Sequence, residues 1–147
     1  MHLYETHLPV ADTETAKAFY IDVVGLKLAH RDRTRDVVFL WAGAGRQSML
    51  GLWGPTTVHG RNFRKCHLAF ELSLPELLSV GAHLQKSGVV TRNFLNEETT
   101  EPSVIGWMPS AQLYFDDPDG HSLEFIALLN DPAKPDFVGS FKDWKVT

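Results

Sequence analysis

The sequence predicts an α+β fold made of two similar units, each with the order strand, helix, strand, strand, strand. Segments in which apolar and polar residues alternate, as in half-buried strands, flank two segments with the spacing of an amphipathic helix. This order occurs in residues 1–54 and again in residues 65–130. Thr6-His7-Leu8 in the first half is echoed by Cys66-His67-Leu68 in the second. The repeated order and the echo together indicate an internal duplication.

The first unit opens with a strand, because residues 2–10 alternate and are rich in Tyr, Leu and Val. Residues 11–25 predict a helix, with Asp12 or Thr13 as the N-cap and Gly25 as the stop. The rest of this unit is predicted to form three more strands, at residues 26–33, 37–41 and 47–53.

The second unit repeats this order with a longer middle section. Residues 65–72 predict a strand, and residues 74–87 predict a helix with Pro75 in its first turn. The remaining segments are, in order, a strand at 89–94, a long loop at 95–110, and two strands at 112–116 and 121–129. The last two strands form a hairpin, because Pro118 presets φ and Gly120 can adopt positive φ in the turn between them.

We therefore expect one domain over residues 1–130. Its modules 1–54 and 65–130 are joined by a turn-rich linker at residues 55–64. Residues 131–147 contain several prolines and charges, and we expect them to form an extended tail over the surface.

Composition excludes several classes of protein. Of the 147 residues, 44% are apolar and 22% charged, which is typical of a globular protein with a real core. A net charge of −4 argues against a nucleic-acid partner. There is no apolar run near the ~18 residues of a membrane span and no signal-peptide pattern, so we expect no membrane partner. The single cysteine, Cys66, suits a reducing cytoplasm.

Three residues are predicted to lie on the less apolar faces of their strands. On the first strand, Tyr4, Leu8 and Val10 share one face and His7 lies on the opposite face. On later strands, His67 and Glu124 also lie opposite the more apolar face. Two imidazoles and a carboxylate suit a divalent transition metal and leave coordination positions open. Ordinary pairing also explains them, with Glu124 facing Lys65 or His67 paired with Glu71.

Three stretches resemble the vicinal oxygen chelate superfamily, which includes glyoxalase I, bleomycin-resistance proteins, fosfomycin-resistance enzymes and extradiol dioxygenases. They are HLPVADTETAKAFYIDVVGLKL (7–28), CHLAFEL (66–72) and YFDDPDGHSLEFI (114–126). The resemblance covers roughly residues 4–130. It implies two βαβββ modules that form a cupped mixed sheet around a metal site.

The resemblance also implies a set of ligands and partners. The metal-binding positions fall on His7, His67 and Glu124, which are the residues that strand alternation selects. The expected cofactor is one divalent ion (Fe, Mn, Zn or Ni), and the expected partner is a small substrate chelated through two oxygens. We also expect a homodimer.

One departure from the family bears on the reaction. Glyoxalase I has a further catalytic glutamate in the last strand of its first module, and here that position falls near Ser48, where no carboxylate is present. The three-ligand pattern looks more like fosfomycin-resistance enzymes or extradiol dioxygenases. Tyr114 is placed similarly to a catalytic tyrosine of the dioxygenases, although a packed strand aromatic explains it as well.

Further candidates for substrate contact are weaker. Trp53 and Trp107 could line an apolar pocket, Arg92 could meet an anionic substrate, and Ser48 occupies the position of the missing glutamate. The sequence therefore predicts a metalloenzyme for a small oxygen-bearing substrate. Its reaction is left open among ring-cleaving dioxygenation, thiol addition to an electrophile, and isomerisation. The alternatives are a glyoxalase I-type lyase and a non-catalytic drug-binding protein similar to bleomycin-resistance proteins.

Overall fold

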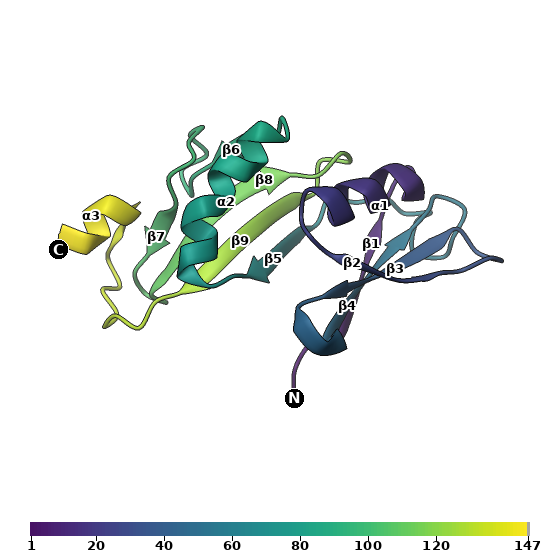
Figure 1. Ribbon diagram of the computed structural model, residues 1–147, viewed down its shortest axis with the longest axis horizontal. Coiled ribbons are helices and arrows are strands. Elements are labelled where there is room, and N and C mark those ends of the chain that lie inside the picture. Colours follow the sequence, from purple (N-terminus) through teal and green to yellow (C-terminus); the bar gives the residue numbers. More distant parts are fainter. Residues whose placement is uncertain (147) are drawn as a thin grey trace. The chain divides into compact units, whose positions relative to one another are not determined.

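The structure is a computed structural model and describes residues 1–146. The chain forms two compact units (Figure 1). Unit 1 comprises Met1–Cys66 together with Asp117–Gly120, and unit 2 comprises His67–Asp116 and the chain after Gly120. Each unit contains one mixed sheet, so the predicted α+β class is confirmed.

Unit 1 is a four-stranded sheet with one long helix. Its elements are β1 (Glu5–Pro9), α1 (Thr13–Asp22), β2 (Lys27–Arg31), β3 (Val37–Ala42), the 3₁₀ turn η1 (Ala44–Arg46) and β4 (Ser48–Trp53). The strand order is β1-β4-β3-β2, with β1 and β4 parallel and the other pairs antiparallel. Leu8, Leu40, Leu50 and Leu52 are buried on one face of the sheet with Tyr20 of α1. The opposite face carries His7.

Unit 2 is a six-stranded sheet with two helices. Its elements are β5 (His67–Glu71), α2 (Leu74–Lys86), β6 (Thr91–Arg92), β7 (Ser103–Ile105), β8 (Ser110–Asp116), β9 (Ser122–Leu128), β10 (Val138–Ser140) and α3 (Phe141–Val146). The main order is β10-β7-β8-β9-β5, and β6 also pairs with β8. In Figure 1, α2 lies along β8 and β9, where Leu77 and Leu84 are buried with Leu113, Phe115 and Phe125.

The ends of both long helices follow from their sequences. Asp12 caps α1, because its carboxylate accepts a hydrogen bond from Thr15 N at 2.7 Å. That hydrogen bond holds the pKa of Asp12 below its ordinary value. A capping box of Ser73 and Glu76 begins α2, with Pro75 in the first turn.

Two segments differ from the expectations. The predicted loop 95–110 contains β7, and the expected extended tail folds into β10 and α3. Val138 pairs with Ile105 of β7, and Trp144 packs edge-on against Phe137 at 5.0 Å. β7 and β10 have three residues each, which is too short to show alternation, so the sequence pattern did not predict them. Thr147, the last residue of the expected tail, lies outside the described residues.

No helix within residues 1–146 is long and apolar enough to cross a membrane.

Candidate metal centre

A buried carboxylate meets an imidazole on the sheet of unit 2. Glu124 lies on β9 and is 7% exposed. The parallel register pairs it with Ala69 of β5, two residues from His67, so both side chains project from the same face. His67 Nε2 lies 2.9 Å from Glu124 Oε2. This contact differs from both ordinary pairings considered from the sequence, which were Glu124 with Lys65 and His67 with Glu71.

The His67–Glu124 pair has the chemistry of a metal site. A buried carboxylate needs a positive partner or hydrogen-bond donors, and a divalent cation meets that need. Imidazole nitrogen and carboxylate oxygen are ordinary ligands of zinc, iron, manganese and nickel. Two such atoms, each about 2.1 Å from one ion, are separated by about 3–3.5 Å. The pair would open only slightly to admit the ion, so these residues fit the metal that the sequence predicts.

Tyr114 lies directly across the sheet from Glu124. The antiparallel register of β8 and β9 pairs the two residues, and the rings of Tyr114 and His67 are 6.2 Å apart. Burial raises the pKa of the Tyr114 hydroxyl well above its ordinary value, and the nearby Glu124 carboxylate raises it further. Tyr114 therefore remains protonated at neutral pH and can donate a hydrogen bond.

In unit 1, His7 is part of a cluster of rings. Its Nε2 lies 2.7 Å from Glu5 Oε1, two residues earlier on the same face of β1. The His7 ring is 4.8 Å from Trp53 of β4 and 4.7 Å from His59. His59 comes from the linker at residues 55–64, and no sequence pattern predicts that it lies beside His7.

The strand register identifies the residue beside His7. In the parallel pair β1–β4, His7 is opposite Gly51. Ser48 lies on the other face of β4, which also buries Leu50 and Leu52, and its hydroxyl donates to the Ala42 carbonyl at 3.4 Å. The position next to His7 is therefore Gly51 rather than Ser48. No carboxylate projects beside His7 from β4.

Of the other predicted contact residues, Arg92 lies opposite Tyr114 in the β6–β8 pair, whereas Trp107 is on an exposed connection. Arg92 donates to Asp116 at 2.8 Å and to Ser122 at 3.1 Å, so its guanidinium already has anionic and polar partners. Trp107 is 63% exposed in the connection between β7 and β8. Arg92 thus borders the site through Tyr114 and Ser122, without a described hydrogen bond to His67 or Glu124.

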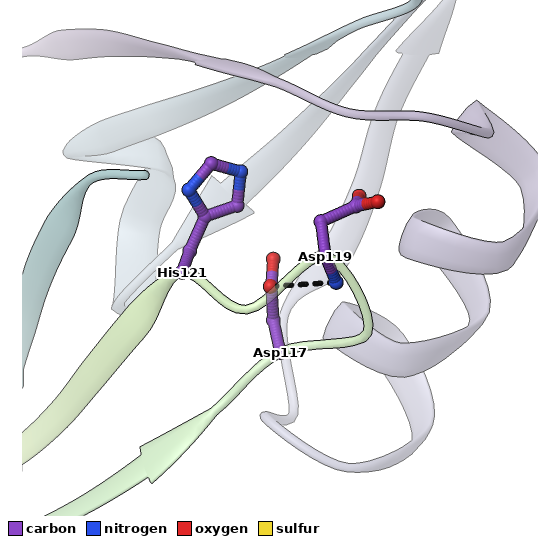
Figure 2. A group of neighbouring side chains, drawn as sticks. All are labelled: Asp117, Asp119 and His121. Carbon is purple, nitrogen blue, oxygen red and sulfur yellow. Dashed lines mark hydrogen bonds between the residues drawn. The ribbon is translucent and has the colours of Figure 1, made fainter. Parts of the chain in front are cut away.

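A second group of metal-type ligands occupies the turn between β8 and β9. Asp117, Asp119 and His121 each offer one ligand atom, and these atoms all lie within 4.8 Å of one another (Figure 2). None of the three residues was among the ligands predicted from the sequence. The alternating Asp-x-Asp-x-His spacing is the signal that could have identified the group.

The two carboxylates of this turn already accept hydrogen bonds. Asp117 accepts from the Tyr20 hydroxyl at 2.9 Å and from the backbone N–H of Asp119 at 3.0 Å. Asp119 accepts from the backbone N–H of Ala11 at 3.2 Å. These bonds fasten the turn to the residue Ala11, just before α1, and to Tyr20 in the last turn of α1, within unit 1. A metal here would compete with them, whereas the only hydrogen bond described for the His67 ring joins it to Glu124.

Within residues 1–146, two buried side-chain polar atoms have no hydrogen-bond partner. One is Trp53 Nε1, on the face of β4 that carries Gly51. The other is Gln112 Oε1, on the face of β8 that carries Tyr114. Each lies on the face that holds predicted ligands in its own unit. Buried polar atoms are nearly always paired, so both are unusual.

A family model supplies the decisive comparison. The model of the Glyoxalase/Bleomycin resistance protein/Dioxygenase superfamily matches residues 2–125. The chain belongs to this superfamily. The match includes all three predicted ligands, His7, His67 and Glu124.

Solved structures agree with this family. An integron cassette protein from the mobile metagenome of a Halifax Harbour sewage outfall is 30% identical, with a TM-score of 0.71 over 86% of this chain and 98% of that one. The fold also matches lactoylglutathione lyase from Agrobacterium tumefaciens (21% identity, TM-score 0.66, covering 86% and 92%) and the oxidase ChaP-H2 (16%, 0.67, 91% and 98%). Among curated proteins, none matches this sequence. The lyase and the oxidase, each less than 25% identical, share the fold of this chain.

Proposed function

We propose that this protein is a metal-dependent enzyme that acts on a small substrate through two of its oxygen atoms. The His67–Glu124 pair is the observation that supports it most strongly. A carboxylate that is 7% exposed lies 2.9 Å from an imidazole, on one face of the unit 2 sheet. Both residues occupy positions where the family resemblance implies metal ligands.

His7 completes the proposed ligand set. Its support is the resemblance of the opening strand and its place on the face of β1 opposite the core. Glu5 is its described hydrogen-bond partner, and that carboxylate is exposed to solvent. An exposed contact of this kind is weak and is easily exchanged for a metal–ligand bond.

A bound divalent ion would act as a Lewis acid toward the substrate oxygens. Tyr114 would donate a hydrogen bond, or a proton, to a substrate oxygen, because its raised pKa keeps the hydroxyl protonated. Glu124 would accept a hydrogen bond from Tyr114 and keep that hydroxyl oriented. The candidate reactions remain ring-cleaving dioxygenation, thiol addition to an electrophile, and isomerisation.

The first test is elemental analysis of protein purified without added metal, followed by metal titration of single variants. We expect near-stoichiometric metal in the wild type. His7→Ala, His67→Ala and Glu124→Ala should each weaken binding by about 100-fold or more, since loss of a mere supporting partner typically costs 10–100-fold. His121→Ala is the matched control and should keep its affinity.

Two outcomes would contradict this assignment. If His121→Ala or Asp119→Asn lost the metal while His67→Ala kept it, the ion would belong to the turn at residues 117–121. If the wild type bound no divalent metal at all, the chain would fit a non-catalytic, drug-binding member of the superfamily better. If the wild type does bind metal, activity assays on the metal-loaded protein with a catechol, an epoxide plus thiol, and a thiohemiacetal separate the three reaction classes.

A further inference from the structure

The indole nitrogen of Trp53 is a buried donor without an acceptor. Trp53 ends β4 and is 6% exposed, and its Nε1 has no hydrogen-bond partner among residues 1–146. A buried tryptophan N–H normally finds an acceptor, because leaving the donor unpaired costs its solvation free energy. Packing of the ring alone does not explain why the N–H is left without one.

The position of this nitrogen depends on Gly51. A Cβ atom added to Gly51 would lie 2.8 Å from Trp53 Nε1 and 3.0 Å from His7 Cδ2. The indole nitrogen therefore lies in the space that a side chain at position 51 would fill. Since Gly51 is opposite His7 in the β1–β4 register, the unpaired N–H lies beside the proposed ligand His7.

The surroundings of Trp53 are polar and carry charges of both signs, since Arg35 is paired with Asp32 at 2.6 Å. The guanidinium of Arg35 lies 5.4 Å from the centre of the Trp53 ring, and the ring of His59 lies 4.4 Å away. Glu5 is the carboxylate bonded to His7, at 2.7 Å from its Nε2. On β4, the group beside His7 is therefore a hydrogen-bond donor, which can pair with an acceptor oxygen.

We propose that the Trp53 indole N–H donates a hydrogen bond to an anionic oxygen of the substrate. The ligand class is an oxyanion, such as a carboxylate, an enolate, a phenolate or a phosphonate. The proposal rests on the proposed function, since it takes His7 to be a ligand of the metal that holds the substrate. It also predicts that the bare position at Gly51 is needed to keep the N–H in place.

Oxalate is a suitable probe, because it chelates metals through two oxygens and keeps two others as acceptors. We expect zinc-loaded Trp53→Phe to bind oxalate about tenfold more weakly than the wild type, or worse, since hydrogen bonds to charged groups are among the stronger ones. The zinc affinity itself should stay within about twofold. Trp41→Phe is the matched control, because Trp41 lies on the same face beside Met49 and should behave as the wild type.

A second probe keeps the Trp53 N–H donor but lacks the acceptor oxygens that oxalate offers. The neutral chelator 2,2′-bipyridine binds through nitrogen and offers no oxygen, so it should bind Trp53→Phe and the wild type equally. Equal loss of both chelators would mean that the substitution merely distorts the site, and would overturn the proposal. Unchanged oxalate affinity in Trp53→Phe with zinc still bound would overturn it too.

Nuclear magnetic resonance gives a readout that does not depend on activity. The chain has four tryptophans, so four indole N–H signals are expected, and the one missing from Trp53→Phe belongs to Trp53. Oxalate should move that signal downfield in the zinc-loaded protein. Gly51→Ala should abolish the shift, whereas a shift that persists would contradict the role of Gly51. Absence of zinc binding in the wild type would overturn the proposed function and this inference with it.

Discussion

At the scale of single residues, Glu124 has the most informative surroundings. Its carboxylate is buried on β9, 2.9 Å from His67 and directly across from Tyr114. The burial makes a charged partner necessary, and the two neighbours supply an imidazole and a hydroxyl. This small group offers two candidate metal-binding atoms and a hydroxyl donor, which are the groups that the proposed function would use.

The Glu124–Tyr114 contact predicts a shift in tyrosine ionisation. Burial raises the pKa of Tyr114 most, and the negative charge of Glu124 raises it further. Glu124→Gln removes that charge, so the tyrosinate becomes easier to form and the pKa of Tyr114 falls toward its ordinary value. Absorbance at 295 nm between pH 9 and 11 should show more tyrosinate in Glu124→Gln than in the wild type. Identical titration curves would show that the carboxylate does not act on Tyr114.

Gly51 leads to a prediction about glyoxalase activity. A glyoxalase I moves a proton between adjacent carbons of the thiohemiacetal with the help of carboxylates, and β4 presents none beside His7. General-base help is commonly worth 10²–10⁴-fold. We expect feeble conversion, or none, of the glutathione–methylglyoxal adduct with nickel, zinc, cobalt or manganese.

Turnover near the ~10 s⁻¹ of ordinary enzymes would contradict that prediction. Glu5 is the carboxylate that could then supply the base, because its Oε1 lies 2.7 Å from His7 Nε2. Loss of such turnover in Glu5→Gln would identify it as the source.

At the scale of elements, the β8–β9 turn and α1 are held together by polar contacts in unit 1. Tyr20 of α1 is fully buried and donates to Asp117, while Asp119 accepts from Ala11 just before the helix. A turn far along the chain is thereby fixed to the first helix. The acidic residues of the DPDG turn thus have a structural role, which explains their bonding without a metal.

The Tyr20–Asp117 hydrogen bond predicts a pH-dependent stability difference. Tyr20→Phe deprives Asp117 of a buried donor and should cost about 1–3 kcal/mol in the free energy of unfolding at pH 7. Burial and the Asp117 carboxylate raise the pKa of Tyr20 in the folded state. Because the pKa of Tyr20 is higher in the folded state than in the unfolded state, Tyr20 stabilises the fold below about pH 10. This contribution to the free energy of unfolding is lost as the pH rises further.

Thermal melts of wild type and Tyr20→Phe at pH 7 and at pH 10.5 test this expectation. The difference in Tm should be largest at pH 7 and should narrow at the higher pH. A difference that stays constant would show that ionisation of Tyr20 plays no part.

At the scale of the whole molecule, the family match predicts the oligomeric state. Superfamily members bind small molecules and often form dimers. We expect this 16.5 kDa chain to behave as a homodimer of about twice that mass in light scattering. A mass of one chain at micromolar concentration would contradict this expectation.

The sequence by itself predicted most of the elements and the faces of the key strands. Alternation is a local property, so the faces of His7, His67 and Glu124 could be read without knowing which strands pair. Both long helices were also predicted, because their caps and stops lie within a few residues of their ends. The strands β7 and β10 were missed, since three residues are too few to establish a period.

The tertiary structure was needed to show which residues face one another. Gly51 stands beside His7 and Tyr114 stands across from Glu124 because of strand register, which is set by pairing between segments distant in the chain. The approach of linker residue His59 to His7, and of Asp117 to Tyr20, likewise joins segments 52 and 97 residues apart (59 − 7 and 117 − 20). Sequence patterns record which side a residue faces, whereas its neighbours on that side depend on how the whole chain packs.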